Sequence, residues 1–218
     1  MGQIFPPSAN TLFRAAVVLT PLALLGAAYL AYLWTWSDFV TGANRIPAQP
    51  VPFSHKHHVS GLGIDCRYCH AAVEKSAFAD LPSTHTCMTC HSQIWNQAAI
   101  LEPVRESFRA DKPIPWVRVN DLPGYVYFNH AIHVNKGVGC AVCHGPVDRM
   151  PMTWKSRSLY MKWCLDCHRD PAPFLRPREE VFNMEWKPGA DGLAQGRELM
   201  QRYHIHAERM TDCTLCHR

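Results

Sequence analysis

The sequence has no cysteine outside a C-x-x-C pair, and every such pair is followed at once by histidine. A disulfide framework has no reason to place histidine after every second cysteine, and a zinc ribbon joins two such pairs without needing that histidine. There is also no run of basic residues, so the formal charge of +4 does not indicate a nucleic-acid partner. These absences argue against a disulfide-stapled domain, a zinc ribbon and a nucleic-acid-binding protein.

What the sequence does contain is the motif C-x-x-C-H, repeated five times. This motif is typical of covalent c-type haem attachment, because two thiols one helical turn apart can each bond a haem vinyl group while the next histidine reaches the iron. We therefore predict five haems c. The predicted thioether cysteines are Cys66, Cys69, Cys87, Cys90, Cys140, Cys143, Cys164, Cys167, Cys213 and Cys216. The predicted proximal iron ligands are His70, His91, His144, His168 and His217.

The chain is short for five haems. From Asp38 to Arg218 it provides only about 36 residues per haem, too few to surround each one with a protein core. We therefore predict a mainly α class with little regular structure, in which short helices carry the motifs and stacked haems form much of the interior. The haem propionates also make the formal charge of +4 a poor guide to partners.

Residues 15–36 contain no charged side chain and would span roughly 33 Å as a helix, enough to cross a bilayer. A cleaved signal peptide is the alternative, but its apolar core is usually only about 7 to 15 residues long. Arg14 before this segment favours a cytoplasmic N-terminus, and covalent haem attachment takes place outside the cytoplasm. We predict a single-pass protein of the bacterial inner membrane, with residues 1–14 cytoplasmic, 15–36 transmembrane and 37–218 periplasmic or otherwise extracytoplasmic.

The spacing of the motifs indicates an internal duplication. Their first cysteines lie at positions 66, 87, 140, 164 and 213, so the gaps are 21, 53, 24 and 49 residues. Two of these gaps are short, which predicts two dihaem units and one terminal haem. The predicted units are 53–91, 128–168 and 193–218. Both dihaem units open with F-[S/N]-H-x-x-H-V, at Phe53–Val59 and Phe128–Val134.

The histidines ahead of each dihaem unit are candidates for the distal iron ligands. Residues three apart share one face of a helix, so two such histidines can reach two different irons from one turn. The candidate pairs are His55 with His58, and His130 with His133. His57 aligns with Ile132 in the second copy, so we predict that His57 is exposed or packs and does not bind iron.

The pattern F-x-H-x-x-H…C-x-x-C-H resembles the class III multihaem cytochromes, the c3 and c7 families. In these families the first histidine binds the haem attached just downstream, and the second binds a different haem. The resemblance therefore implies that His55 caps the haem of His70, and that His130 caps the haem of His144. The histidines that then serve two of the remaining three haems are His58 and His133.

The repeat supplies four distal ligands for five irons. Met150 precedes Cys164 by 14 residues, close to the separations by which His55 and His130 precede their own cysteines, so we predict Met150 as the fifth. Met161 is the alternative, and these methionines could instead simply pack against porphyrin. Met152 is a further candidate, and His204 or His206 could serve the terminal haem. His85 precedes Cys87 by two residues, so the attachment turn should hold it away from the distal face of its haem. The choice matters because methionine–histidine ligation raises the reduction potential above that of two histidines.

Several features together resemble the pentahaem cytochrome c subunits of alternative complex III, a bacterial quinol-oxidising membrane assembly. They are one N-terminal membrane helix, the 2+2+1 motif arrangement, "LPSTHTCMTCHSQIW", "MKWCLDCHRDP" and the ending "CTLCHR". The resemblance covers nearly the whole chain. It implies a respiratory-chain subunit that passes electrons towards a periplasmic acceptor. The implied partners are an iron–sulfur subunit, polytopic quinol-binding subunits and a monohaem cytochrome c.

The motifs themselves favour electron relay over catalysis. If every iron has six ligands, no position is open for a substrate, so we predict a relay subunit with no catalytic residue. A multihaem reductase needs a vacant iron, often signalled by C-x-x-C-K, whereas all five motifs here end in histidine. A self-contained, membrane-anchored multihaem quinol dehydrogenase is the stronger alternative. It differs in haem number, and the uncharged helix offers no evident proton acceptor for quinol.

Overall fold

The computed structural model describes residues 4–217. Residues 1–3 of the predicted cytoplasmic segment and residue 218 of the predicted terminal haem unit lie outside the described residues. The chain divides into two compact units, Met1–Gly42 and Ala43–Arg218, and each is described here by itself.

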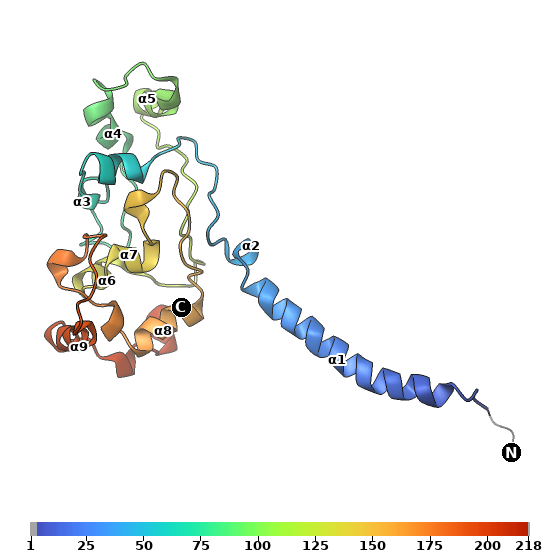
Figure 1. The fold of residues 1–218 in the computed structure, drawn as a ribbon. Coiled ribbons are helices and arrows are strands. Elements are labelled where there is room, and N and C mark those ends of the chain that lie inside the picture. Colours follow the sequence, from blue (N-terminus) through green and yellow to red (C-terminus); the bar gives the residue numbers. More distant parts are fainter. Residues whose placement is uncertain (1–3, 218) are drawn as a thin grey trace. The chain divides into compact units, whose positions relative to one another are not determined.

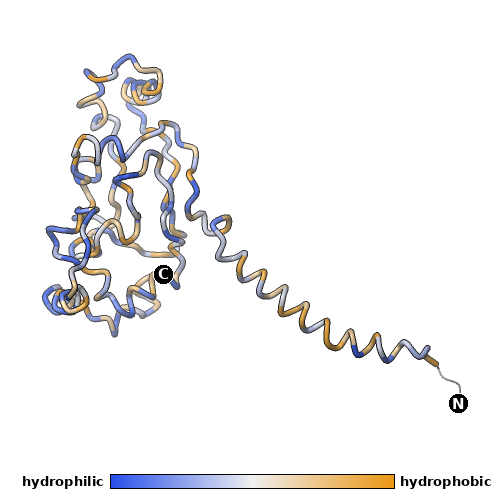
Figure 2. The backbone as a smooth tube through the Cα atoms, in the orientation of Figure 1, coloured by the Kyte–Doolittle hydropathy of each residue, from blue (hydrophilic) through white to orange (hydrophobic). Residues whose placement is uncertain are grey.

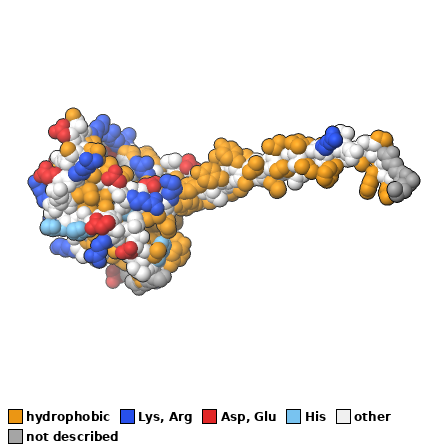
Figure 3. Space-filling model, turned by 90° about the horizontal axis from the view of Figure 1, so that it is seen from below, with side chains coloured by type: hydrophobic (Ala, Val, Ile, Leu, Met, Phe, Trp, Pro, Cys, Tyr) orange, Lys and Arg blue, Asp and Glu red, His pale blue; other side chains and the backbone are white. Residues whose placement is uncertain are grey.

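The first unit is dominated by helix α1, Ala9–Thr35, followed by the short helix α2, Asp38–Thr41. None of the residues of α1 is buried, and at about 1.5 Å per residue the helix is roughly 40 Å long. Apolar residues follow it along its length (Figures 2 and 3). It begins six residues before the predicted span because no proline or glycine interrupts the polar flank from Ala9 to Arg14. By length and composition, α1 is apolar enough to serve as a membrane anchor or a signal segment.

The second unit is built from short helices joined by long connections (Figure 1). Between residues 4 and 217 there is no β-sheet, and the strand-like pairing consists of three isolated bridges. The predicted class, mainly α with little regular structure, is therefore confirmed. The α-helices are α3 (Cys66–Cys69), α4 (Thr84–His91), α5 (Glu102–Ala110), α6 (His130–Asn135), α7 (Cys140–His144), α8 (Met161–Arg169), α9 (Gly192–Arg202) and α10 (Cys213–Cys216). The 3-10 turns are η2 (Ala99–Leu101), η3 (Val147–Arg149), η4 (Ala172–Phe174), η5 (Arg178–Glu180) and η6 (Ala207–Arg209), and η1 (Lys56–Gly61) is a π-helix.

The interior of the second unit consists of small separate clusters of buried apolar side chains. Each of the three clusters contains three buried residues and a few partly buried neighbours. Clusters of this size fit a chain in which haems fill much of the interior. Their members are Val51, Val104 and Ile114; Val73, Val134 and Val181; and Leu175, Leu199 and Tyr203.

The connection between the two predicted dihaem units, residues 102–124, is packed onto the rest of the chain. Val104 of α5 and Ile114 contribute to the cluster around Val51. Farther along, the Gln49 side chain accepts a hydrogen bond from Val117 N at 3.0 Å and donates one to Val117 O at 2.8 Å. The segment is therefore anchored at several points before it reaches α6.

Candidate haem-binding sites

The five motifs lie on five short helices, α3, α4, α7, α8 and α10, which we number sites 1 to 5 in chain order. All ten cysteines are free thiols, so none is committed to a disulfide. In site 1 the amide of His70 donates to the carbonyl oxygen of Cys66 at 2.9 Å, and site 5 repeats this between His217 and Cys213. Each turn brings its two thiols and the following histidine together on one short segment. This is the arrangement that attachment of a haem c requires.

Three of the predicted proximal histidines face a second histidine across a gap of nearly constant width. A metal–imidazole bond is about 2 Å long, so two imidazoles on opposite sides of one metal place their ring centres roughly 6 Å apart. The observed distances between ring centres therefore suit an iron between the rings. The pairs are His58–His91 at 6.2 Å, His130–His144 at 6.3 Å and His133–His168 at 6.1 Å.

His55 lies close to His70, the predicted proximal histidine of site 1. Burial, and next the charge of the neighbouring His70, lower the pKa of His55 to about 4. Burial, and next His130, lower the pKa of His144 to about 4 as well. A neutral imidazole keeps the lone pair that binds a metal, so these surroundings suit ligands of iron.

The phenylalanine that opens each repeat contacts both histidines of its pair. Phe53 meets His55 edge-on, with ring centres 5.0 Å apart, and stacks on His58 at 4.5 Å. Phe128 meets His130 edge-on at 4.7 Å and stacks on His133 at 4.5 Å. The sequence repeat is thus also a repeat of geometry. The sequence showed the phenylalanine but gave no role for it.

The second histidine of each pair is also oriented in the same way in both copies. Nδ1 of His58 donates to the Ser54 carbonyl oxygen at 2.9 Å, and Nδ1 of His133 donates to the Asn129 carbonyl oxygen at 2.8 Å. In each case the acceptor lies four residues earlier. A ring that donates through Nδ1 leaves Nε2 available for a metal.

Other predicted ligands also donate through Nδ1 to backbone carbonyl oxygens. These bonds are His70 to Asp80 at 2.7 Å, His91 to Ile94 at 3.1 Å, His130 to Ala77 at 3.0 Å and His168 to Met210 at 2.8 Å. Two ligands have side-chain partners instead. His55 Nδ1 lies 3.0 Å from the Thr153 hydroxyl, and His144 Nδ1 lies 3.1 Å from the Asn120 amide. Sequence reasoning missed Thr153 and Asn120, since both are distant in sequence and neither belongs to a motif.

Two histidines outside the paired set have different surroundings. His57 is exposed, and its ring stacks on Trp95 with centres 6.0 Å apart. His85 packs edge-on against Phe108, and its Nε2 lies 3.7 Å from a carboxylate oxygen of Asp111.

Site 5 differs from the other four. The ring stacked on His217 belongs to Tyr125, with centres 5.8 Å apart. Of the two methionines predicted as candidates for the fifth ligand, Met150 is fully buried, whereas Met161 is 62% exposed at the start of α8. The Met150 carbonyl oxygen also accepts a hydrogen bond from the Lys56 amide at 3.0 Å.

The pKa shifts of four thiols indicate which haem sites lie next to one another. In four cases burial raises the pKa of a thiol, and a thiol of another site adds to the rise. The pairs are Cys69 with Cys87, Cys140 with Cys66, Cys143 with Cys167, and Cys164 with Cys216. A 2.7 Å hydrogen bond between Tyr68 and Thr89 also joins sites 1 and 2. The attachment helices therefore follow the order α4, α3, α7, α8 and α10, and Figure 1 shows the first four in this sequence.

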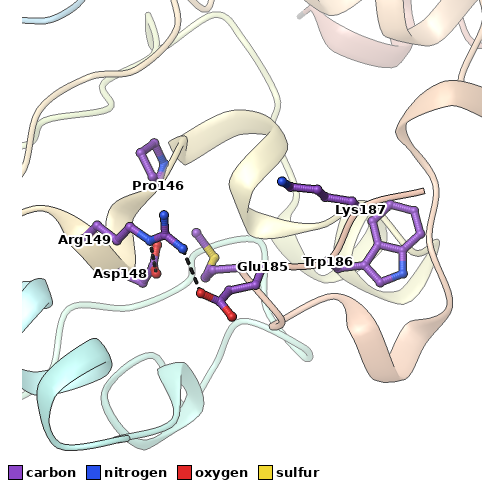
Figure 4. A pocket seen from close by; sticks show the side chains of 7 residues that line it. Pro146, Asp148, Arg149, Glu185, Trp186 and Lys187 are labelled. Carbon is purple, nitrogen blue, oxygen red and sulfur yellow. Dashed lines mark hydrogen bonds and ion pairs between the residues drawn. The ribbon is translucent and has the colours of Figure 1, made fainter. Parts of the chain in front are cut away.

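A surface pocket of about 420 Å³ is lined by Pro146, Asp148, Arg149, Met184, Glu185, Trp186 and Lys187. Arg149 crosses it, at 2.8 Å from Glu185 and 3.6 Å from Asp148 (Figure 4). None of the predicted iron ligands lines this pocket, so it adds nothing to the ligand set.

Comparison with known proteins gives two results. Residues 126–218 match the family model described as cytochrome c7 and related cytochrome c. The chain is also 31% identical over 160 residues to the protein named "Menaquinone reductase, multiheme cytochrome c subunit" from Nitratidesulfovibrio vulgaris strain Hildenborough. That alignment covers 64% of this chain and 76% of the relative.

Proposed function

Because the chain belongs to the family of multihaem cytochromes c that includes this menaquinone reductase subunit, we propose that it is an electron-relay subunit of a quinone-linked membrane complex. The five motifs fit five c-type haems. When bound, each haem supplies one-electron transfer at its iron. The protein fixes the spacing, orientation and potential of the haems, and it is not an enzyme on its own.

The observation that carries this proposal is the facing of histidines across gaps of 6.1–6.3 Å. Two imidazoles at this distance could both bind a haem iron placed between them, and that iron would then have no open position for a substrate. This supports His58 and His133 as distal ligands of sites 2 and 4, and His130 as the distal ligand of site 3. The closeness of His55 to His70 supports the same role for His55 at site 1.

The order of the attachment helices supports a path for the electrons. We propose that the haems form one line in the order 2, 1, 3, 4, 5, so that sites 2 and 5 are the ends. Sites 2 and 5 then exchange electrons with partner proteins, and sites 1, 3 and 4 carry the electrons from one end to the other.

The partners and the direction of electron flow complete the proposal. The resemblance to the pentahaem subunits of alternative complex III favours quinol oxidation towards a periplasmic acceptor. The name of the Nitratidesulfovibrio relative instead favours reduction of menaquinone. In either direction we propose an iron–sulfur subunit, polytopic quinone-binding subunits and a monohaem cytochrome c as partners.

The location proposed for the chain follows from its two units. The apolar helix α1 would anchor it in the bacterial inner membrane by a single pass, with the N-terminus in the cytoplasm. Residues 37–218 would then be periplasmic, with dihaem units at 53–91 and 128–168 and a terminal haem unit at 193–218.

Purification from native membranes in mild detergent tests the proposal. We expect polytopic and iron–sulfur subunits to co-purify with the chain, and the complex to reduce its haems with quinol or to oxidise them with menaquinone. The direction that operates distinguishes the two kinds of complex. A lone chain that reduces its own haems with quinol would contradict the relay and support a self-contained quinol dehydrogenase.

A further inference from the structure

The proximal histidine of site 3 has a hydrogen-bond partner unlike those of the other paired sites. Nδ1 of His144 lies 3.1 Å from Nδ2 of the Asn120 side chain. The proximal histidines of sites 1, 2 and 4 instead donate to backbone carbonyl oxygens. A substitution cannot remove a backbone carbonyl, but it can remove an amide side chain. Site 3 therefore has a hydrogen-bond partner that a substitution can change.

The hydrogen bonding of Asn120 shows which of its two amide atoms belongs at the ring. Its Oδ1 is buried and has no hydrogen-bond partner among residues 4–217. A histidine that binds iron through Nε2 carries its proton on Nδ1, so it needs an acceptor, and an amide nitrogen cannot accept. Half a turn of the amide brings Oδ1 to the ring. The oxygen then gains a partner, and the Nδ1 proton gains an acceptor.

The backbone near Asn120 is anchored to the rest of the chain. Three residues earlier, Val117 is fixed by two hydrogen bonds with the Gln49 side chain. Arg118 and Asp121 lie on either side of Asn120, with 3.8 Å between a guanidinium nitrogen and a carboxylate oxygen. The partner of His144 therefore comes from residues 102–124, the connection that joins the two dihaem units.

We propose that Asn120 is a positioning residue for site 3: its Oδ1 accepts a hydrogen bond from Nδ1 of His144 and so sets the ring orientation and the electron donation of that imidazole to iron. This rests on the proposed role of His144 as an iron ligand. A stronger acceptor at Nδ1 makes the imidazole a better donor, stabilises ferric iron and lowers the reduction potential. Site 3 is the middle of the proposed line of haems, so its potential affects every electron that passes.

Thr153 occupies a similar position at site 1. Its hydroxyl lies 3.0 Å from Nδ1 of His55, which we propose as the distal ligand there. Sites 1 and 3 adjoin each other through Cys66 and Cys140. The two sites with side-chain acceptors are thus neighbours in the line.

Two substitutions at Asn120 test the proposal through shifts of opposite sign. Asn120→Leu removes the acceptor, and we expect the potential of one haem to rise. Asn120→Asp provides a stronger acceptor, and we expect the potential of the same haem to fall, with altered g-values in its ferric low-spin EPR signal. Mediated potentiometric titration of the purified protein measures both. The titration does not depend on electron relay in a complex, so a negative result for Asn120 would leave the proposed function untouched.

Two further variants serve as controls. Asn96→Leu exchanges an exposed amide and should leave all five potentials unchanged. Thr153→Val should shift the reduction potential of one haem, and this haem should differ from the one whose potential Asn120→Leu shifts. The number of haems bound per chain, expected to be five, shows that each variant has folded. Unchanged potentials in both Asn120 variants, or shifts of the same sign in both, would overturn the proposal.

Discussion

His57 and His58 are adjacent residues with different surroundings. His57 is exposed and stacks on Trp95, whereas the ring of His58 is fixed by Phe53 and lies 6.2 Å from His91. Comparison of the two repeats predicted this difference, because the second repeat has an isoleucine in place of His57. Composition alone could not have distinguished the surroundings of two adjacent histidines that precede the same motif.

We expect His58→Ala to leave one iron without its proposed distal ligand, because His58 is the ring that faces His91 at 6.2 Å. One of the five haems should then become high-spin, with the ferric spectrum of the other four unchanged. His57→Ala is the matched control and should leave every haem low-spin. Ferric EPR of both purified variants measures this. A high-spin signal in the His57 variant alone would reverse the assignment.

The fifth distal ligand is also a question at the residue scale. Met150 is fully enclosed by protein atoms, whereas Met161 is exposed and lies one helical turn before Cys164, the thiol that neighbours Cys216 of site 5. Residues three apart share one helix face, so we infer that Met161 is directed towards site 5, as Cys164 is. We therefore favour Met161, the alternative of the two in the sequence prediction, as the ligand of that iron.

Methionine bound to ferric haem gives a characteristic charge-transfer band at long wavelength. We expect this band in the intact protein and its loss in Met161→Leu. In that variant the reduction potential of one haem should also fall, because a methionine ligand raises the potential. Met150→Leu is nearly volume-conserving and should retain the band. Loss of the band only in the Met150 variant would instead support Met150, the first of the two sequence predictions, as the ligand.

At the scale of elements, the duplicated histidine segment was predictable and its exact helical form was not. The spacing of F-x-H-x-x-H predicts one turn in both copies, yet His130–Asn135 is an α-helix and Lys56–Gly61 is a π-helix. The neighbours of each turn differ, because Ser60 in the first copy donates to the carbonyl oxygen of Asp148 at 2.7 Å. Such contacts join residues far apart in sequence, so local spacing does not reveal them.

Helix α9 depends on a glycine at its contact with η4. A Cβ atom added at Gly196 would overlap the carbonyl oxygen of Ala172, and backbone cannot move aside as a flexible side chain can. Leu199 of the same helix belongs to the buried cluster with Leu175 and Tyr203. The close approach of α9 therefore supports one of the three small clusters of the second unit.

We expect Gly196→Ala to lower the free energy of unfolding by roughly 1 to 3 kcal/mol, the usual effect of overpacking. The control is Gly189→Ala, because a Cβ at Gly189 meets nothing within 4 Å. Thermal unfolding followed by haem absorbance compares the two midpoints. Equal midpoints would show that α9 can shift away from η4 without loss.

At the scale of the whole molecule, the number of haems was predictable and their spatial order was not. Five motifs fix the count, but the attachment helices follow the order α4, α3, α7, α8 and α10 rather than the chain order. This order depends on contacts such as Cys66 with Cys140, which lie 74 residues apart. Motif spacing carries no information about contacts of that range, so only the folded chain reveals them.

The division into two units leads to a prediction about solubility. The unit Ala43–Arg218 contains all five motifs, the three buried clusters and the paired histidines, whereas no residue of α1 is buried. We therefore expect a chain that starts at Ala43, behind a cleavable secretion signal, to accumulate in the soluble periplasmic fraction. It should carry five haems, with the ferric EPR spectrum of the full-length protein in detergent as the reference. A soluble chain with fewer haems, or a spectrum with new high-spin signals, would mean that residues before Ala43 help to complete a haem site.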